Sequence, residues 1–247
     1  MKAYFFELVD FALNQLTGAE VLLLKFEGEV SDFVRFNHGR VRQPLSVTQR
    51  YLALTLIQDQ RQQRVTFSLT GNKATDCELL TQQLGMMRHQ LPNLPIDPYL
   101  LYATDGCDSD QVRRGVLPTI DQAIGDIVDQ AGGLDLVGIL SSGPIYRGFA
   151  NSLGQRNWHE VDAFLFDWSI YQIADKAIKM SYSGTHWDRS QLRSRIDTAR
   201  TQLPYLEKAA VSIEPGEYPA YLCAAAVNEL LGLLNWSGFS AKEQHTQ

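Results

Sequence analysis

The sequence has few of the features that mark secreted, membrane-spanning or disulfide-bonded proteins. Its three cysteines, Cys77, Cys107 and Cys223, are far apart and include no C-x-x-C pair. This pattern argues against a disulfide framework and a thiolate zinc site, and is typical of a reducing compartment. No apolar run, including residues 21–24, is long enough to span a bilayer, and Glu7 and Asp10 follow Met1 too early for a signal peptide. We therefore expect a cytoplasmic protein without a membrane partner.

Basic charge is also scarce. The chain of 247 residues has 22 Lys and Arg against 28 Asp and Glu, which gives a net charge of -6. Proteins that bind a phosphate backbone directly carry an excess of Lys and Arg. We therefore expect no direct nucleic-acid partner. With 45% hydrophobic residues, the chain is long enough to bury the core of one large or two ordinary domains.

Catalytic motifs are missing as well. No two of the five histidines lie within one helical turn of each other, so the sequence has no His-x-x-x-His metal pair: His38, His89, His159, His186 and His245. A G-x-S-x-G elbow, a P-loop and a G-x-G-x-x-G loop are absent too. The residues thus predict no catalytic constellation and no cofactor.

The first part of the chain combines helix-like and strand-like stretches. Apolar residues at helical spacing predict helices over 5–16 and from about 74 to 91. Between them lie stretches that predict strands: 21–26, 33–36, 41–43, 45–57 and 64–69. The residues 37–40, Asn-His-Gly-Arg, predict a hairpin turn because Asn and Gly tolerate positive φ. Prolines 92, 95 and 98 then predict a domain boundary, since each removes a backbone donor.

The second part is organised around residues 134–182, which predict an antiparallel meander of at least four strands. Turn clusters at 141–144, at 151–154 and at Gly184 separate these strands. Further elements are expected before and after the meander: a polar connection at 105–114, helices at 118–131 and 188–206, a strand at 218–223 and a helix at 224–234. We interpret the arginines of 188–206 as a solvated helix face, because neighbouring acidic side chains reduce the local positive charge. The predicted fold class is α+β, with an N-terminal helix plus a small antiparallel sheet, then a long antiparallel β-meander flanked by helices.

Three stretches together resemble the TldD/PmbA family. They are Phe-Val-Arg-Phe-Asn-His-Gly-Arg-Val-Arg-Gln at 33–43, Arg-Gly-Phe-Ala-Asn-Ser-Leu-Gly at 147–154 and Glu-Pro-Gly-Glu-Tyr at 214–218. They occur in the family's order and span nearly the whole chain. Members of this family are modulators of DNA gyrase and subunits of a cytoplasmic metalloprotease. The resemblance implies an N-terminal α+β region, a middle region with a long curved antiparallel sheet, and a C-terminal β-rich domain.

On this basis we divide the chain into three regions. They are an N-terminal α+β region at 1–94, a middle region with the meander and its covering helices at 95–214, and the start of a truncated C-terminal domain at 215–247. Whether the chain is a truncated fragment or a naturally short homologue stays open. The helix at 224–234 then has little to bury its apolar side against. We expect this region to be poorly packed, docked on a second chain, or laid back against the meander.

The resemblance also bears on metal binding. In the TldD subunit of the protease, a His-Glu-x-x-x-His metal motif lies on the helix that corresponds to 224–234. Here Asn228 and Leu233 stand in place of the two histidines. An amide is a poor zinc ligand and leucine is none, so no metal is expected at this position. The chain is similar to the PmbA (TldE) kind of subunit, which lacks the motif.

Our first hypothesis is a non-catalytic PmbA/TldE-like subunit or fragment that scaffolds a peptide-binding chamber together with a TldD-like partner. Arg147, Asn151, Ser152 and Gly154 are the residues predicted for the peptide or partner surface. Sheet edges also serve this role, because an extended peptide can add to an unpaired edge. The expected partners are a TldD-like subunit, a second copy of the chain, or unfolded peptide. The alternative is a stand-alone interaction or regulatory module without a proteolytic role, and a third hypothesis is an enzyme that acts alone.

Overall fold

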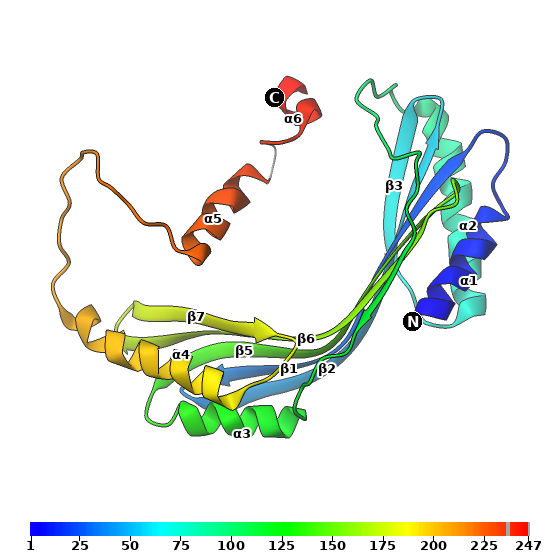
Figure 1. The fold of residues 1–247 in the computed structure, drawn as a ribbon. Coiled ribbons are helices and arrows are strands. Elements are labelled where there is room, and N and C mark those ends of the chain that lie inside the picture. Colours follow the sequence, from blue (N-terminus) through cyan, green and yellow to red (C-terminus); the bar gives the residue numbers. More distant parts are fainter. Residues whose placement is uncertain (236–237, 247) are drawn as a thin grey trace.

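The computed structural model describes residues 1–235 and 238–246, and its strands form one sheet (Figure 1). Within these residues the strand order is β3-β2-β1-β5-β6-β4, and β7 also pairs with β6. The strands are β1 (Val21–Asn37), β2 (Arg40–Gln58), β3 (Arg61–Ser68), β4 (Ser109–Arg113), β5 (Asp135–Asn151), β6 (Arg156–Ile173) and β7 (Lys176–Gly184). Neighbours are antiparallel, except that β4 runs parallel to β6.

Helices flank both ends of this sheet. The flanking helices are α1 (Lys2–Leu13), α2 (Lys73–Gln90), α3 (Ile120–Gln130) and α4 (Arg189–Gln202), while α5 (Ala224–Leu234) and α6 (Ala241–Thr246) lie apart from the sheet. Figure 1 shows α1 and α2 beside one end of the sheet and α3 and α4 beside the other, with the strands bending between the two pairs. The predicted α+β class, with an antiparallel sheet and flanking helices, is confirmed.

The side chains of β1 show that α1 to α4 all cover the same face of the sheet. Leu22, Leu24 and Phe26 belong to a first core that contains α1 and α2, whereas Val34 and Phe36 belong to a second core that contains α3 and α4. Side chains alternate between the two faces of a strand, and these five positions all have even numbers. The helices therefore lie on one face, on the outer side of the bend (Figure 1). In the described part of the chain, no helix buries side chains against the other face.

Aromatic side chains fill both cores. In the first core Trp158 of β6 stacks on Phe5 of α1, with ring centroids 6.2 Å apart, and on Phe26 of β1 at 6.0 Å. In the second core Phe166 and Trp168 of β6 are stacked at 4.6 Å. Phe26 and Trp158 lie on either side of Gly148 of β5, so their rings meet over this glycine, and Phe166 and Trp168 are two residues apart on β6. The strand β6 thus anchors both cores, as β1 does.

Helix starts follow local sequence signals. The Oδ1 atom of Asn72 accepts a hydrogen bond from Thr75 N at the start of α2, and Thr119 forms a capping box with Gln122 at the start of α3. Asp188 caps α4 through Ser190 N and Gln191 N. Such side chains satisfy backbone donors that have no partner inside the helix. Four predicted helices begin within two residues of the expected positions, and α1 begins three residues earlier than expected.

Several predicted strand boundaries are wrong. The stretches 21–26 and 33–36 belong to one strand, β1, and the turn expected at 141–144 lies inside the continuous strand β5. The meander consequently has three strands, not four, and the turn at 174–175 was missed. Gly143 and Pro144 interrupt only the pairing with β1, where the ladder skips Val30 and Ser31, while the pairing with β6 continues. The tertiary neighbour β6 therefore overrides a local turn signal.

The remaining differences concern exposed segments. The polar connection at 105–114 contains β4, which pairs with β6 along its backbone. The strand expected at 218–223 is absent, because no described strand lies beside it to supply hydrogen bonds. The helix at 224–234 forms as expected, and none of its residues is buried. The three arrangements expected after residue 215, namely poor packing, docking on a second chain or lying back against the meander, stay predictions, as does the division into regions 1–94, 95–214 and 215–247.

One buried carboxylate holds the first helical layer together. Asp76 of α2 is fully buried, and its carboxylate accepts hydrogen bonds from Thr70 N at 2.8 Å, Thr70 Oγ1 at 3.1 Å, Gly71 N at 2.9 Å and the hydroxyl of Tyr4 on α1. Burial raises the pKa of this carboxyl, but the hydrogen bonds from Tyr4, Thr70 and Gly71 outweigh burial and hold the pKa below its usual value. The group therefore stays ionised at neutral pH.

Replacing this carboxylate will destabilise the fold. Asp76→Ala leaves the donors of Tyr4, Thr70 and Gly71 without their acceptor, and we expect it to lower the free energy of unfolding by about 2–4 kcal/mol. Urea denaturation at pH 7 measures this change. Glu78→Ala, at an exposed position of the same helix, is the control and should change the stability by less than about 0.5 kcal/mol. Equal effects of the two substitutions would contradict the role of Asp76.

The same site makes part of the stability depend on acid pH. Because the pKa of folded Asp76 lies below the usual value of 3.8, its contribution is complete above that pH and is lost as the pH falls through the folded-state pKa. Asp76→Asn removes this titration. We expect the difference in unfolding free energy between wild type and Asp76→Asn to be largest at neutral pH and to shrink below about pH 4. A difference that is constant from pH 7 to pH 3 would contradict this assignment.

Candidate functional site

The face of the sheet opposite α1 to α4 is the surface that a peptide or partner can reach. We call it the open face, and on β1 it consists of the odd-numbered residues. Phe33 lies between Leu45 of β2 and Ser141 of β5, and Arg35 lies between Gln43 of β2 and Ile139 of β5. Because cross-strand neighbours point to the same side, these residues form continuous rows across the strands.

An apolar groove runs along one half of the open face. Its volume is about 340 Å³, and it is lined by Phe33, Arg35, Gln43, Leu45, Val47, Gln49 and Ile139. Leu45 is 53% exposed and Ile139 is 46% exposed. Apolar side chains that are exposed together and rimmed by polar ones are typical of interaction surfaces rather than of ordinary solvated strands. We call this feature the apolar groove.

Charged side chains occupy the other half of the open face. Glu27 lies directly opposite Arg147 of β5, and Arg147 lies opposite His159 of β6. The Nζ atom of Lys25 contacts Glu27 Oε1 at 2.7 Å. The hydrogen bond from Lys25 lowers the pKa of Glu27 despite partial burial, and the charge of Arg147 acts in the same direction. Glu27 is therefore an ionised acceptor at neutral pH and is poorly suited to act as a proton donor.

The structure separates Arg147 from the other three residues predicted for the binding surface. The side chain of Arg147 is exposed on the open face, where Nη1 donates to the carbonyl oxygen of Tyr146 at 2.9 Å. Its Nη1 atom also lies 3.5 Å from the carbonyl oxygen of Gly28. In the described residues the guanidinium has no carboxylate within ion-pair distance, so it remains available to a ligand.

Asn151, Ser152 and Gly154 instead build the turn between β5 and β6. Asn151 is only 2% exposed, and its Oδ1 atom accepts hydrogen bonds from Leu153 N and Gln155 N, both at 3.0 Å. Ser152 exchanges two hydrogen bonds with the backbone of Leu22 on β1, and Gly154 has a positive φ of 97°. These contacts account for the three residues as turn formers. Their role in binding a peptide or partner stays a prediction.

The positions predicted to have lost metal ligands lie on α5. Leu233 is 75% exposed, and Asn228 is exposed as well. Throughout residues 1–235 and 238–246, no group of three or more His, Cys, Asp and Glu side chains is placed to hold a metal ion. Cys77, Cys107 and Cys223 are all free thiols. Within the same residues, no helix combines the length and apolar character needed to cross a membrane.

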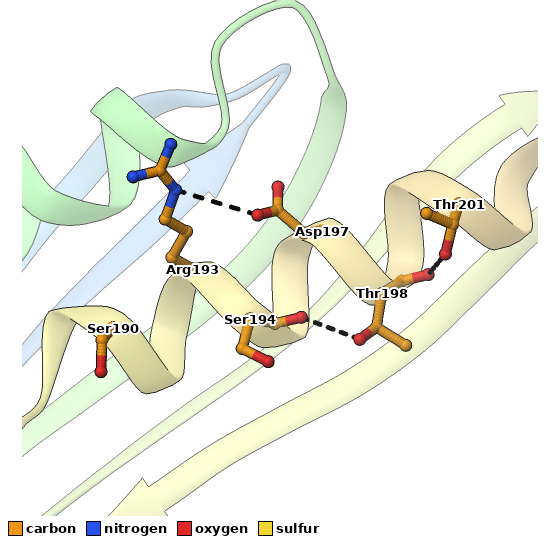
Figure 2. A pocket seen from close by; sticks show the side chains of 6 residues that line it. All are labelled: Ser190, Arg193, Ser194, Asp197, Thr198 and Thr201. Atoms are coloured by element: carbon orange, nitrogen blue, oxygen red, sulfur yellow. Dashed lines mark hydrogen bonds and ion pairs between the residues drawn. The ribbon is translucent and has the colours of Figure 1, made fainter.

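A second surface hollow, of about 480 Å³, lies along α4 (Figure 2). Its polar groups are already used within the helix, since Thr198 Oγ1 donates to Ser194 O and Thr201 Oγ1 donates to Thr198 O, both at 2.8 Å. Arg193 pairs with Asp197 at 3.8 Å. These contacts fit the interpretation of this helix as a solvated face and leave no convergent groups for a ligand.

The apolar groove was missed by our sequence reasoning. The available signal was the apolar residues at even positions, Leu22, Leu24 and Phe26 and then Val34 and Phe36, although the burial pattern reverses between them at Val30 and Ser31. Reading 21–37 as one strand would have placed Phe33 and Arg35 on the face opposite the core. Their neighbours Leu45 and Ile139 depend on the register of β2 and β5, which no local pattern fixes.

Two substitutions distinguish a residue that stabilises the turn, Asn151, from a residue that lies on the open face, Arg147. Asn151→Ala leaves Leu153 N and Gln155 N without an acceptor, and we expect it to lower the free energy of unfolding by about 1–3 kcal/mol. Arg147→Ala removes a side chain bonded only to backbone oxygens at the surface, so the change should stay within about 0.5 kcal/mol. Urea denaturation of both variants tests this. A larger loss for Arg147→Ala than for Asn151→Ala would show that the two roles are reversed.

Comparison with known proteins relates this fold to three solved structures. No family model matches the sequence, and a comparison with the curated proteins found no match. TldE from Thermococcus kodakarensis is 11% identical with a TM-score of 0.57, and the alignment covers 82% of this chain and 47% of TldE. A putative modulator of a DNA gyrase from Thermotoga maritima is 10% identical with a TM-score of 0.53, over 81% of this chain and 48% of that one.

A putative modulator of DNA gyrase from Bacteroides thetaiotaomicron is 14% identical with a TM-score of 0.50, over 79% of this chain and 49% of that protein. The chain thus spans about half the length of the solved structures that it matches. At these identities the likeness concerns the fold. The chain has the fold of part of TldE and of the putative modulators of DNA gyrase, which confirms the helices and the long antiparallel sheet implied by the resemblance to the TldD/PmbA family, while the implied C-terminal β-rich domain stays a prediction.

Proposed function

We propose that the chain is a non-catalytic, TldE-like subunit or fragment of a cytoplasmic metalloprotease of the TldD/PmbA type. Its open face would form one wall of the chamber in which a TldD-like partner cuts unfolded peptide. The observation that carries this proposal is the open face itself, which has an apolar groove and no covering helix in the described part of the chain. A bent sheet of this kind leaves a broad concave surface for a partner or peptide.

The chemistry of the open face supports a binding role rather than catalysis. Glu27, Arg147 and His159 lie in one row, but the hydrogen bond from Lys25 lowers the pKa of Glu27, so this carboxylate is a poor proton donor. Asn228 and Leu233 supply no histidine at the positions where the TldD subunit carries its metal ligands. The chain would therefore contribute surface to the chamber, and the TldD-like partner would contribute the metal.

Open strand edges give a second route to a partner. Among the described strands, β4 and β7 both pair only with β6, and β3 pairs only with β2. The residues of β4 are all exposed. An extended segment of peptide or of a partner strand can add to such an edge through backbone hydrogen bonds. The edge and the apolar groove together would hold an unfolded chain without requiring a particular sequence.

The alternative is an interaction or regulatory module without a proteolytic role. It would use the same open face, so the identity of the partner distinguishes the two. An enzyme that acts alone is the third hypothesis. Metal-dependent peptide hydrolysis by the purified chain, lost on substituting one of its five histidines, would establish it.

The proposed role is tested with the TldD-like protein of the same organism. We expect the two purified proteins to form a complex in size-exclusion chromatography with light scattering. Leu45→Asp places a carboxylate in the apolar groove and should weaken the complex by about tenfold or more, because its formation would bury this side chain. Leu101→Asp is the matched control, since Leu101 is 92% exposed outside the groove, and it should leave the affinity unchanged.

Absence of a complex would overturn the proposal of a TldE-like subunit. A complex that Leu45→Asp and Leu101→Asp affect equally would retain the partner but exclude the open face as the contact. Thermal unfolding of both variants must first show the wild-type transition, so that loss of folding is not mistaken for loss of binding.

A further inference from the structure

The segment after α4 crosses the open side of the molecule and is held at both ends. At its beginning, Lys176 Nζ of β7 donates to the carbonyl oxygens of Leu206 at 2.9 Å and Lys208 at 3.3 Å. Near its end, Lys242 of α6 pairs with Asp97 at 2.7 Å. Figure 1 shows α5 between these two ends, on the inner side of the bend and away from α1 to α4.

The helix α5 carries an apolar stripe that no part of the described structure covers. Val227, Leu230, Leu231 and Leu234 follow the spacing i, i+3, i+4 and i+7, and each is between 39% and 52% exposed. A helix of 11 residues is marginal in water unless its apolar side is packed. Its one charged residue, Glu229, lies on the opposite side from the stripe, so packing the stripe would not bury a charge. The stripe therefore needs an apolar surface.

The apolar groove has dimensions that suit this helix. Along β2 it extends from Gln43 to Gln49, which is about 20 Å at the rise of a strand. The 11 residues of α5 extend over about 16 Å. The groove and the stripe are both apolar and uncovered, and both lie on the side away from α1 to α4. Packing a helix on an uncovered sheet face is the usual way to complete such a layer.

The two connections permit this contact and fix its direction. Fifteen residues lead from Lys208 to Cys223, all exposed and without helix or strand, and they can reach about 50 Å. Only seven residues separate Leu234 from Lys242, which can reach about 27 Å. Asp97 is bonded to Gln60 and Gln62 of the β2–β3 hairpin, beyond the Gln49 end of the groove. The C-terminal end of α5 must therefore lie near Gln49 and its N-terminal end near Gln43.

We propose that α5 is a strap that closes onto the apolar groove of its own chain, with its apolar stripe on Phe33, Leu45 and Ile139. In the closed form the strap occupies the surface that a partner or peptide would use, so that binding there requires its displacement. The tether keeps α5 close to the groove at any protein concentration, which favours its own chain over a second copy. This inference concerns the chain alone and does not depend on a protease partner.

Native Cys223, which is exposed at the start of α5, provides the test. In a Cys77→Ser, Cys107→Ser background, a second cysteine is introduced as Gln43→Cys, Gln49→Cys or Glu78→Cys. A short bismaleimide then cross-links the dilute full-length protein, and the products are resolved by mass. We expect monomeric cross-links to form fastest with Gln43→Cys, more slowly with Gln49→Cys and slowest with Glu78→Cys, which lies on α2 behind the sheet.

A pair of substitutions on α5 separates docking from random encounters of the tether. Leu231 lies in the apolar stripe. Leu231→Asp should slow the Gln43→Cys cross-link by about tenfold, because the docked form would lose the burial of one leucine side chain. Gly232→Asp adds the same charge on the other side of the helix, where an added Cβ meets nothing within 4 Å, and should leave the rate unchanged. Far-ultraviolet circular dichroism checks that both variants keep their helix content.

Three outcomes would overturn the proposal. Equal rates for Gln43→Cys and Glu78→Cys would mean that the strap does not prefer the groove. Products with the mass of a dimer would make the occupant a second copy of the chain. Equal effects of Leu231→Asp and Gly232→Asp would show that the apolar stripe is not the contact.

Discussion

The continuous strand β1 is the constraint on which the rest of the structure depends. It pairs with β2 on one side and with β5 on the other, and it supplies side chains to both hydrophobic cores. Side chains alternate between the two faces along a continuous strand. Once Leu22 and Leu24 face the helices, Val34 and Phe36, which also have even numbers, face the same side. Four helices are thereby placed on one side, and the opposite side is left without a helical layer. The open face is thus a consequence of strand register rather than of a separate folding unit.

This arrangement explains why the described residues form surfaces suited to binding but do not form an evident catalytic group of side chains. Arg147 and His159 reach solvent from neighbouring strands, yet the acid in their row is already paired with Lys25. The buried side chains of Asp76 and Asn151 accept hydrogen bonds from backbone N–H groups and serve the fold. The exposed surfaces that have no packing partner in the described residues are apolar, namely the groove on the sheet and the stripe on α5.

The sequence predicts this structure well where the signals are local and poorly where they are tertiary. Helical periodicity and capping residues such as Asn72, Thr119 and Asp188 locate the helices, because each acts within one turn of its own position. The Ser-Ser-Gly-Pro segment fails as a turn because β6 pairs with it without interruption. The polar strand β4 cannot be recognised from its own residues, since only the backbone of β6 makes it a strand. Likewise, Arg147 could be named from a family phrase, but the apolar groove depends on the register of three strands.

The interruption opposite Gly143 and Pro144 has a mechanical consequence. At this point β5 loses its hydrogen bonds to β1, and an added Cβ on Gly143 would lie 2.1 Å from the carbonyl oxygen of Val30. The two cores meet across this interruption, through which the β1–β2 and β5–β6 pairings continue. A rotation of ten degrees there would move the far end of a strand eight residues away by about 5 Å. A change of angle at this interruption would therefore change the curvature of the open face without breaking either core.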